Sequence, residues 1–145
     1  TKFGVELGRY LFYDKRLSKN DKIACASCHL QEFAFSDTSR FSTGFEGGKT
    51  RRNSMALFNL RWAPSFFWDA RAATLEEQAL MPIQDHIEMG MNLDDMVAKL
   101  EELKEYDERF KKAFKSSEIT SEKVAMGIAQ FVRTLVSQNS NLCMH

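Results

Sequence analysis

The chain has 145 residues, enough for one domain with its own hydrophobic core. Hydrophobic residues make up 43% and charged residues 28%, and 20 basic residues balance 20 acidic ones. This balance gives no electrostatic case for nucleic acid or an anionic membrane as a partner. No apolar run approaches the roughly 18 residues that cross a bilayer, so no membrane span is expected.

The N-terminal segment predicts a helix over residues 5–13, which carry apolar side chains at positions 5, 7 and 10–13. A polar connection follows at residues 14–21. The chain opens directly into this helix-like sequence with no secretory leader, and we therefore expect a mature chain.

The next segment contains Cys25-Ala26-Ser27-Cys28-His29, which reads C-x-x-C-H, the attachment signature of a c-type haem. Two thiols at this spacing can reach the two vinyl groups of one porphyrin, and the following imidazole can then bind the iron. We expect the motif on a short helix over residues 23–30. A redox-active cysteine pair, half of a zinc site and two unremarkable cysteines are the alternatives.

A third cysteine, Cys143, is left over near the end of the chain. A zinc site formed by Cys25, Cys28, Cys143 and His145 is chemically possible, but no spacing selects it. We expect instead that Cys143 is an exposed free thiol, or that the chain is cut inside a motif at this point.

Residues 36–54 form the longest stretch without periodicity, and a loop of this length tends to be functional. Its cations Lys49, Arg51 and Arg52 could pair with haem propionates or simply be solvated. Residues 55–69 lack a helical stripe and are expected to form an extended wall in which Trp68 contacts either the core or a cofactor.

A second helix is predicted to begin at Thr74, where Thr74 and Glu77 match a capping box. Pro82 must end or kink this helix, because proline lacks an N–H and clashes with the preceding turn. An irregular polar segment is expected over residues 85–91.

The C-terminal half is predicted to be helical. Asn92 caps one helix, residues 106–115 form a second, and Thr120 caps the last. Met96 and Met126 lie near apolar stripes and are expected in the core. No strand alternation is found, so the fold class is all-α: a cytochrome c-like helical haem domain with long loops over residues 1–145.

Several landmarks then occur in a fixed order. They are Leu7-Gly8-Arg9-Tyr10-Leu11-Phe12-Tyr13-Asp14, the C-x-x-C-H motif, Phe33-Ala34-Phe35-Ser36-Asp37, Arg52-Asn53-Ser54, Phe67-Trp68-Asp69-Ala70-Arg71, Glu88-Met89-Gly90-Met91 and Phe131-Val132-Arg133-Thr134. This order resembles the N-terminal, peroxidatic haem domain of the bacterial dihaem cytochrome c peroxidases, over roughly residues 4–141. That family includes relatives that oxidise tryptophans in a partner protein.

The resemblance implies roles for individual residues. Cys25 and Cys28 would hold one covalent haem c, and His29 would be its proximal iron ligand. Glu88 matches the distal acid that moves a proton between the two oxygens of peroxide. Gln78 and Pro82 match residues that shape the distal pocket. Trp68 matches an aromatic residue between the two haems and is a possible electron relay. Asn53 matches a contributor to a possible calcium site.

Two departures from the family pattern matter. Phe45 stands where many members carry a loop histidine that caps the iron, so we expect a sixth iron position that is open or filled by water. His86 is the alternative candidate for the sixth iron ligand. The second C-x-x-C-H domain is absent, which leaves a truncation, a fragment, or a single-haem relative that pairs with another domain or copy.

The expected function is reduction of hydrogen peroxide to water, with electrons from a small cytochrome or copper protein, in the periplasm. One alternative is a single-haem electron carrier in which a methionine, Met89 or Met91 by position, closes the sixth site. The other is a haem subunit that oxidises a partner protein.

Overall fold

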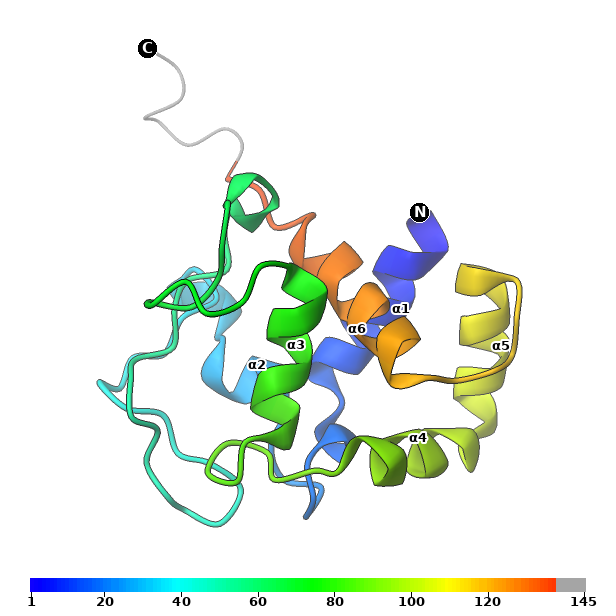
Figure 1. Ribbon diagram of the computed structural model, residues 1–145, viewed down its shortest axis with the longest axis horizontal. Coiled ribbons are helices and arrows are strands. Elements are labelled where there is room, and N and C mark those ends of the chain that lie inside the picture. The colour runs from blue at the N-terminus through cyan, green and yellow to red at the C-terminus, as the bar shows by residue number, and fades with distance from the viewer. Residues whose placement is uncertain (138–145) are drawn as a thin grey trace.

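The computed structural model describes residues 1–137. This part of the chain is helical, with isolated bridges in place of strands, which confirms the all-α prediction. The helices are α1 Lys2–Tyr13, α2 Cys25–Cys28, α3 Leu75–Gln84, α4 Leu93–Glu101, α5 Lys104–Phe114 and α6 Ser121–Val132 (Figure 1). Among the described residues, no helix is both long enough and apolar enough to cross a membrane.

Helix α6 is the centre of the fold. It lies against both α1 and α3 (Figure 1), and its apolar side chains Val124, Ile128 and Phe131 are buried, as the helical spacing predicts. The crossing with α1 brings backbone onto backbone, because a Cβ atom added to Gly8 would lie 1.8 Å from the carbonyl oxygen of Gly127. Only glycine at position 8 allows so close an approach, because any larger residue there would strike the Gly127 backbone.

The helix caps follow local sequence rules. The Thr74 hydroxyl accepts a hydrogen bond from the Glu77 amide (3.1 Å), and the Asn92 side chain accepts one from the Asp94 amide (2.8 Å). Thr120 caps α6 in the same way. These three helix starts were predicted correctly because a cap depends on residues within one turn of it.

Two expectations for the helices need correction. Pro82 was expected to end or kink its helix, but helix α3 does not end there and continues two residues to Gln84, although proline at position 82 cannot donate to the Gln78 carbonyl. Met126, expected in the core, has 46% of its surface exposed, whereas Met96 is fully buried.

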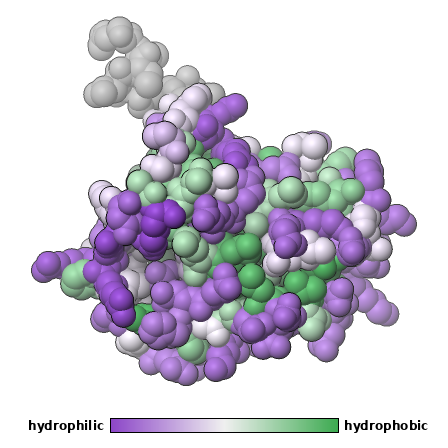
Figure 2. Space-filling view, viewed as in Figure 1, coloured by the Kyte–Doolittle hydropathy of each residue, from purple (hydrophilic) through white to green (hydrophobic). Residues whose placement is uncertain are grey.

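Residues 31–74 carry no α-helix, as predicted for most of this stretch, and form the cyan-to-green side of the molecule in Figure 1. Two short 3-10 turns, Gln31–Phe33 and Leu60–Trp62, interrupt this segment, and a third, Lys15–Leu17, follows α1. Figure 2, in the same view, shows mostly hydrophilic side chains on this side and apolar ones toward the middle of the molecule. The irregular segment therefore presents a largely polar surface, while Phe35, Leu57 and Phe66 pack into the core.

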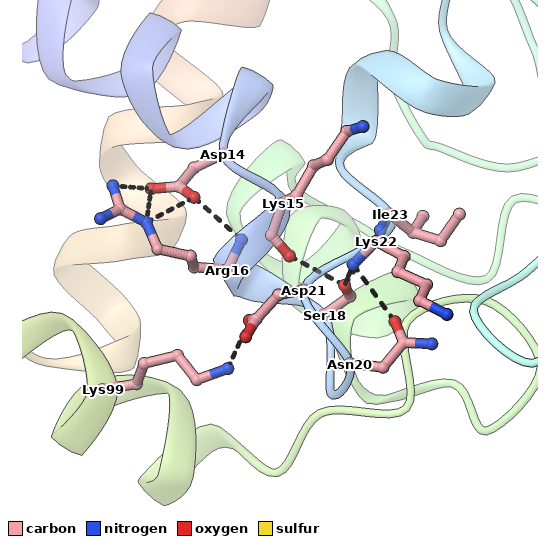
Figure 3. A network of polar contacts seen from close by, with 9 residues as sticks. All are labelled: Asp14, Lys15, Arg16, Ser18, Asn20, Asp21, Lys22, Ile23 and Lys99. Atoms are coloured by element: carbon pink, nitrogen blue, oxygen red, sulfur yellow. Dashed lines mark hydrogen bonds and ion pairs between the residues drawn. The ribbon is translucent and has the colours of Figure 1, made fainter.

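The connection between α1 and α2 is held by Ser18, whose side chain is fully buried (Figure 3). Its hydroxyl donates to the Lys15 carbonyl (2.8 Å) and accepts from the amides of Lys22 (3.2 Å) and Ile23 (3.1 Å). The Lys19 amide donates to the Met89 carbonyl (2.9 Å). These bonds fix the chain on its way into the C-x-x-C-H motif and tie it to the turn after α3.

The contact between α1 and α6 generates a first prediction. Gly8→Ala places a methyl group against the Gly127 backbone, which cannot move aside, and should lower the free energy of unfolding by about 1–3 kcal/mol or more. Urea denaturation followed by circular dichroism measures this loss. Gly48→Ala is the matched control, because its added methyl meets only ordinary contact with Ile87 (3.5 Å). Equal losses in both variants would contradict the assignment.

Candidate functional site

The C-x-x-C-H motif occupies a single helical turn. Helix α2 spans only Cys25–Cys28, and His29 leaves the helix with φ −121° and ψ 80°. The predicted helix over residues 23–30 is therefore too long. It stops early because Leu30 pairs with Ser36 in an isolated bridge, so the chain must turn back directly after the histidine.

The imidazole of His29 is held in one tautomer. Its Nδ1 lies 2.7 Å from the Phe35 carbonyl oxygen. Because a carbonyl can only accept, Nδ1 must carry the hydrogen, and Nε2 keeps its lone pair. Burial lowers the pKa of His29, although hydrogen bonding to backbone carbonyls opposes this shift. The lowered pKa favours the neutral imidazole, which is the form that binds a metal.

The two thiols are kept protonated. Burial raises the pKa of Cys25 to about 12 and also raises the pKa of Cys28, against a hydrogen bond from Ser42. Zinc binding and disulfide exchange both need a thiolate, so these surroundings favour neither. Within residues 1–137 no group of three or more His, Cys, Asp or Glu side chains could hold a metal ion. Cys143 and His145, the other half of the possible zinc site, lie outside the described residues.

His29 lines a cavity of about 390 Å³, which is in the range of roughly 300–1,000 Å³ typical of small-molecule and cofactor sites. Three parts of the chain build its other walls: helix α3, the turn that follows it, and the irregular segment. The predicted site residues that line it with His29 are Asn53, Trp68, Gln78, Pro82, His86 and Glu88.

Glu88 is presented by a tight turn. The Asp85 carboxylate accepts hydrogen bonds from the amides of Ile87 (2.8 Å) and Glu88 (3.2 Å). Gly90, at φ +60°, lets the chain return to the core. Burial and the nearby charge of Asp85 raise the pKa of Glu88, while the charge of Arg71 opposes the shift. A carboxyl group whose pKa is raised in this way holds a proton more readily, which suits it to accept one and return it during a reaction.

Trp68 and Asn53 form one unit in the cavity wall. The Trp68 indole donates to the Asn53 carbonyl (2.9 Å), and the Asn53 amide group donates to the Ser39 carbonyl (2.8 Å). Trp68 is 63% exposed, so it belongs to the surface and to the cavity but not to the core. Calcium binding at Asn53 stays a prediction.

Phe45 does not line the cavity. Its ring packs against Gly90, its amide donates to the Glu88 carbonyl (3.0 Å), and its carbonyl accepts from the Asn20 side chain (2.6 Å). The predicted cofactor contact therefore becomes a support for the turn that carries Glu88.

Two of the three arginines that line the cavity, Arg52 and Arg71, share one carboxylate. Asp69 forms ion pairs with Arg52 and with Arg71, both at 2.8 Å. Arg51 also lines the cavity, whereas Lys49 is bonded to the Thr43 hydroxyl. Sequence reasoning assigned no role to Arg71, which lies 3.5 Å over the Phe67 ring. No spacing rule could have identified it, because its importance comes from proximity to Glu88 in the folded chain.

A buried polar network anchors the irregular segment behind the motif. The Ser42 hydroxyl, which is 1% exposed, bonds the Asp37 carboxylate (2.6 Å) and the Ser54 hydroxyl (2.8 Å). Ser36 bonds the Ser54 carbonyl (2.6 Å). Because Ser42 also reaches the Cys28 thiol, this network fixes the segment against α2. Ser42 was missed in the sequence because buried serines leave no pattern.

These features fit a covalently attached haem. The donor set is one neutral imidazole with Nε2 free, and two protonated thiols lie on the adjoining helical turn. Arginines at the cavity wall match the acidic edge of a porphyrin.

The sequence profile of the di-haem cytochrome c peroxidase family matches residues 2–142. Methylamine utilization protein MauG of Methylophilus methylotrophus is 37% identical over 90% of this chain and 39% of its own length. Cytochrome c551 peroxidase of Nitrosomonas europaea is 38% identical over 94% of this chain and 41% of its own length.

A solved structure agrees with these matches. A MauG-like protein associated with microbial copper homeostasis superimposes with a TM-score of 0.88 at 36% identity, covering 94% of this chain and 41% of the other. The chain belongs to the di-haem cytochrome c peroxidase family, as its motifs predict. It spans about two fifths of the length of the relatives that it matches.

The polar network generates a second prediction. Ser42→Ala leaves the Asp37 carboxylate and the Ser54 hydroxyl without their buried partner and should lower the free energy of unfolding by about 1–3 kcal/mol. Thermal denaturation measures the change. Ser39→Ala is the control, because the Ser39 side chain is exposed and makes no hydrogen bond within residues 1–137. A loss below about 0.5 kcal/mol for Ser42→Ala would place it with neutral surface changes and contradict the network.

Proposed function

We propose that this chain forms a haem c peroxidase domain that reduces hydrogen peroxide to water. The observation that carries the proposal is that His29, with Nε2 free, and Glu88, with a raised pKa, line the same cavity. The family membership supports the same activity. Cys25 and Cys28 would attach the haem, and His29 would bind its iron. Bound there, the iron supplies the centre at which the O–O bond of peroxide breaks.

The protein's own contribution is proton transfer and positioning. The Glu88 carboxylate takes a proton from one peroxide oxygen and returns it to the departing one, since breaking the O–O bond unevenly requires this transfer. Gln78 and Pro82 line the same cavity and shape the space in which peroxide lies. The half-buried position of Glu88 excludes water that would compete for the proton.

The partners are proposed on the same basis. Electrons would come from a small cytochrome or copper protein, and the exposed indole of Trp68 offers an electron path from the cavity to the surface or to a second haem domain. That second domain could be part of a longer chain or of another copy. Asn53 would contribute to a calcium site at the junction, and covalent haem attachment supports a periplasmic location.

The carrier alternative has less support. A carrier needs a closed sixth iron position, yet Met89 and Met91 are both buried in the core and do not line the cavity. His86 does line it and is the one sequence-predicted sixth ligand that does so. Oxidation of a partner protein is a second candidate function for the same site. The exposed Trp68 indole favours it, because it offers an electron path from the cavity to the surface.

The test of the peroxidase proposal is Glu88→Gln. Loss of the carboxylate should slow the peroxide-induced shift of the haem Soret band and lower kcat/KM for peroxide by about 10²–10⁴-fold. Stopped-flow absorbance of the haem-loaded protein measures both. Glu101→Gln, an exposed surface acid at the end of α4, is the control and should react at the parental rate. An unchanged rate in Glu88→Gln would rule out its acid–base role.

The pH dependence gives an independent check. Only the ionised carboxylate can take the first proton, so kcat/KM should fall as the pH drops through the pKa of Glu88. Because that pKa is raised, the acid limb should lie above the ordinary glutamate value of about 4.3. The limb should disappear from the profile of Glu88→Gln. An acid limb that persists in the profile of Glu88→Gln would show that another group titrates, which would contradict the assignment to Glu88.

The sixth iron position can be read from the ferric spectrum. An open or water-filled site predicts a high-spin signature in the oxidised protein at neutral pH, because water is a weak ligand. His86→Ala should leave that spectrum unchanged. A purely low-spin spectrum that becomes high-spin in His86→Ala would instead identify His86 as the resting ligand.

A further inference from the structure

A second cleft, of about 800 Å³, lies between α1 and α5, which run side by side (Figure 1). All three tyrosines of the chain, Tyr10, Tyr13 and Tyr106, line it. None of them belongs to the haem cavity. Such a concentration of phenol rings in one cleft is not explained by the proposed peroxide chemistry.

The cleft carries more positive than negative charge. Arg9, Lys15, Arg16 and Arg109 line it together with Glu6, Asp14 and Glu105. Arg16 pairs with both Asp14 (2.7 Å) and Glu105 (2.8 Å), and Arg109 pairs weakly with Glu6 (3.8 Å). Arg9 and Lys15 form no ion pair within the described part of the chain. A free guanidinium beside tyrosine rings suits an aromatic molecule that carries a carboxylate.

Tyr13 connects this cleft to the haem site. Consecutive residues of a helix point about 100° apart, so Tyr13 is 44% exposed while its neighbour Phe12 is buried. The Phe12 ring lies 5.4 Å from the Tyr13 ring and 6.4 Å from the His29 imidazole, centroid to centroid. A continuous series of rings therefore leads from the cleft to the iron ligand.

We propose that Tyr13 is a surface oxidation site, at which small aromatic carboxylates with an oxidisable phenol deliver electrons to the haem site through Phe12 and His29. The inference rests on the proposed function, because peroxide supplies the oxidant. Arg9 binds the carboxylate of the reductant, and the half-exposed ring of Tyr13 contacts its phenol ring.

The electron balance is simple. Tyr13 loses one electron, which passes inward, and its phenolic proton, which passes to water. Gln31, the hydrogen-bond partner of its hydroxyl within residues 1–137, is distant (3.4 Å) and is not a base. A phenolic reductant then returns one electron and one proton to Tyr13 and leaves as a radical. Two reductant molecules supply the two electrons and two protons that convert one hydrogen peroxide to two waters.

The first experiment locates the radical. Haem-loaded protein is mixed with one equivalent of peroxide and a nitroso spin trap without reductant, and the adduct is located by peptide mass spectrometry. The adduct is expected on Tyr13 and is lost in Tyr13→Phe. Trp62→Phe is the control, because Trp62 is an exposed oxidisable residue that lines neither cavity, and it should keep the Tyr13 adduct.

The second experiment tests the ligand class with 4-hydroxyphenylacetate as the anionic probe and 4-methylphenol as its neutral analogue. Arg9→Gln should raise KM for the anion and leave KM for the neutral phenol unchanged, while the Tyr13 adduct persists. Equal KM changes for both probes would overturn the carboxylate assignment.

The outcomes separate the two proposals. A normal Soret shift with an adduct elsewhere, for example on Trp68, overturns the surface site alone. Absence of any Soret shift with peroxide overturns the proposed function and the surface site with it.

Discussion

The hydrogen bond from His29 Nδ1 to the Phe35 carbonyl is the contact on which the site depends. It fixes which nitrogen is free to bind a metal, and it sets the plane of the ring. It exists only because Ala34 and Phe35 both adopt left-handed backbone conformations, at φ 59° and 56°, and bring the carbonyl back over the histidine. Non-glycine residues take such angles at a cost, so the surrounding packing must hold the turn in place.

That packing comes from both halves of the molecule. The Phe12 ring of α1 lies against Phe35 and against Phe131 of α6, so the turn rests on the central helix crossing. On its other side the buried hydroxyl of Ser42 ties residues 36–54 to α2. The cavity is thus bounded by the helical core and by an irregular segment that joins this core through Phe35, Leu57 and Phe66. The chemistry lies where these two kinds of structure meet.

The sequence predicted well what is decided locally. The caps at Thr74, Asn92 and Thr120 depend on residues within one turn, and all three were correct. What the sequence could not predict depends on tertiary contacts. Met126 has helical spacing typical of a core residue, yet within residues 1–137 it is 46% exposed. Phe45 packs on Gly90 behind the Glu88 turn, a contact that its place in the family pattern does not express. The raised pKa of Glu88 and the role of Arg71 depend on burial and proximity, which spacing cannot express.

The link between Lys19 and Met89 has a consequence for the size of the reaction space. The segment that leads into His29 is bonded directly to the turn that presents Glu88, where the Lys19 amide donates to the Met89 carbonyl. A second link is indirect: the Asn20 side chain donates to the Phe45 carbonyl, and the Phe45 amide donates to the Glu88 carbonyl. The distance between His29 and Glu88 therefore depends on the length of residues 14–24. A single inserted residue there would change the width of the cavity between these two side chains.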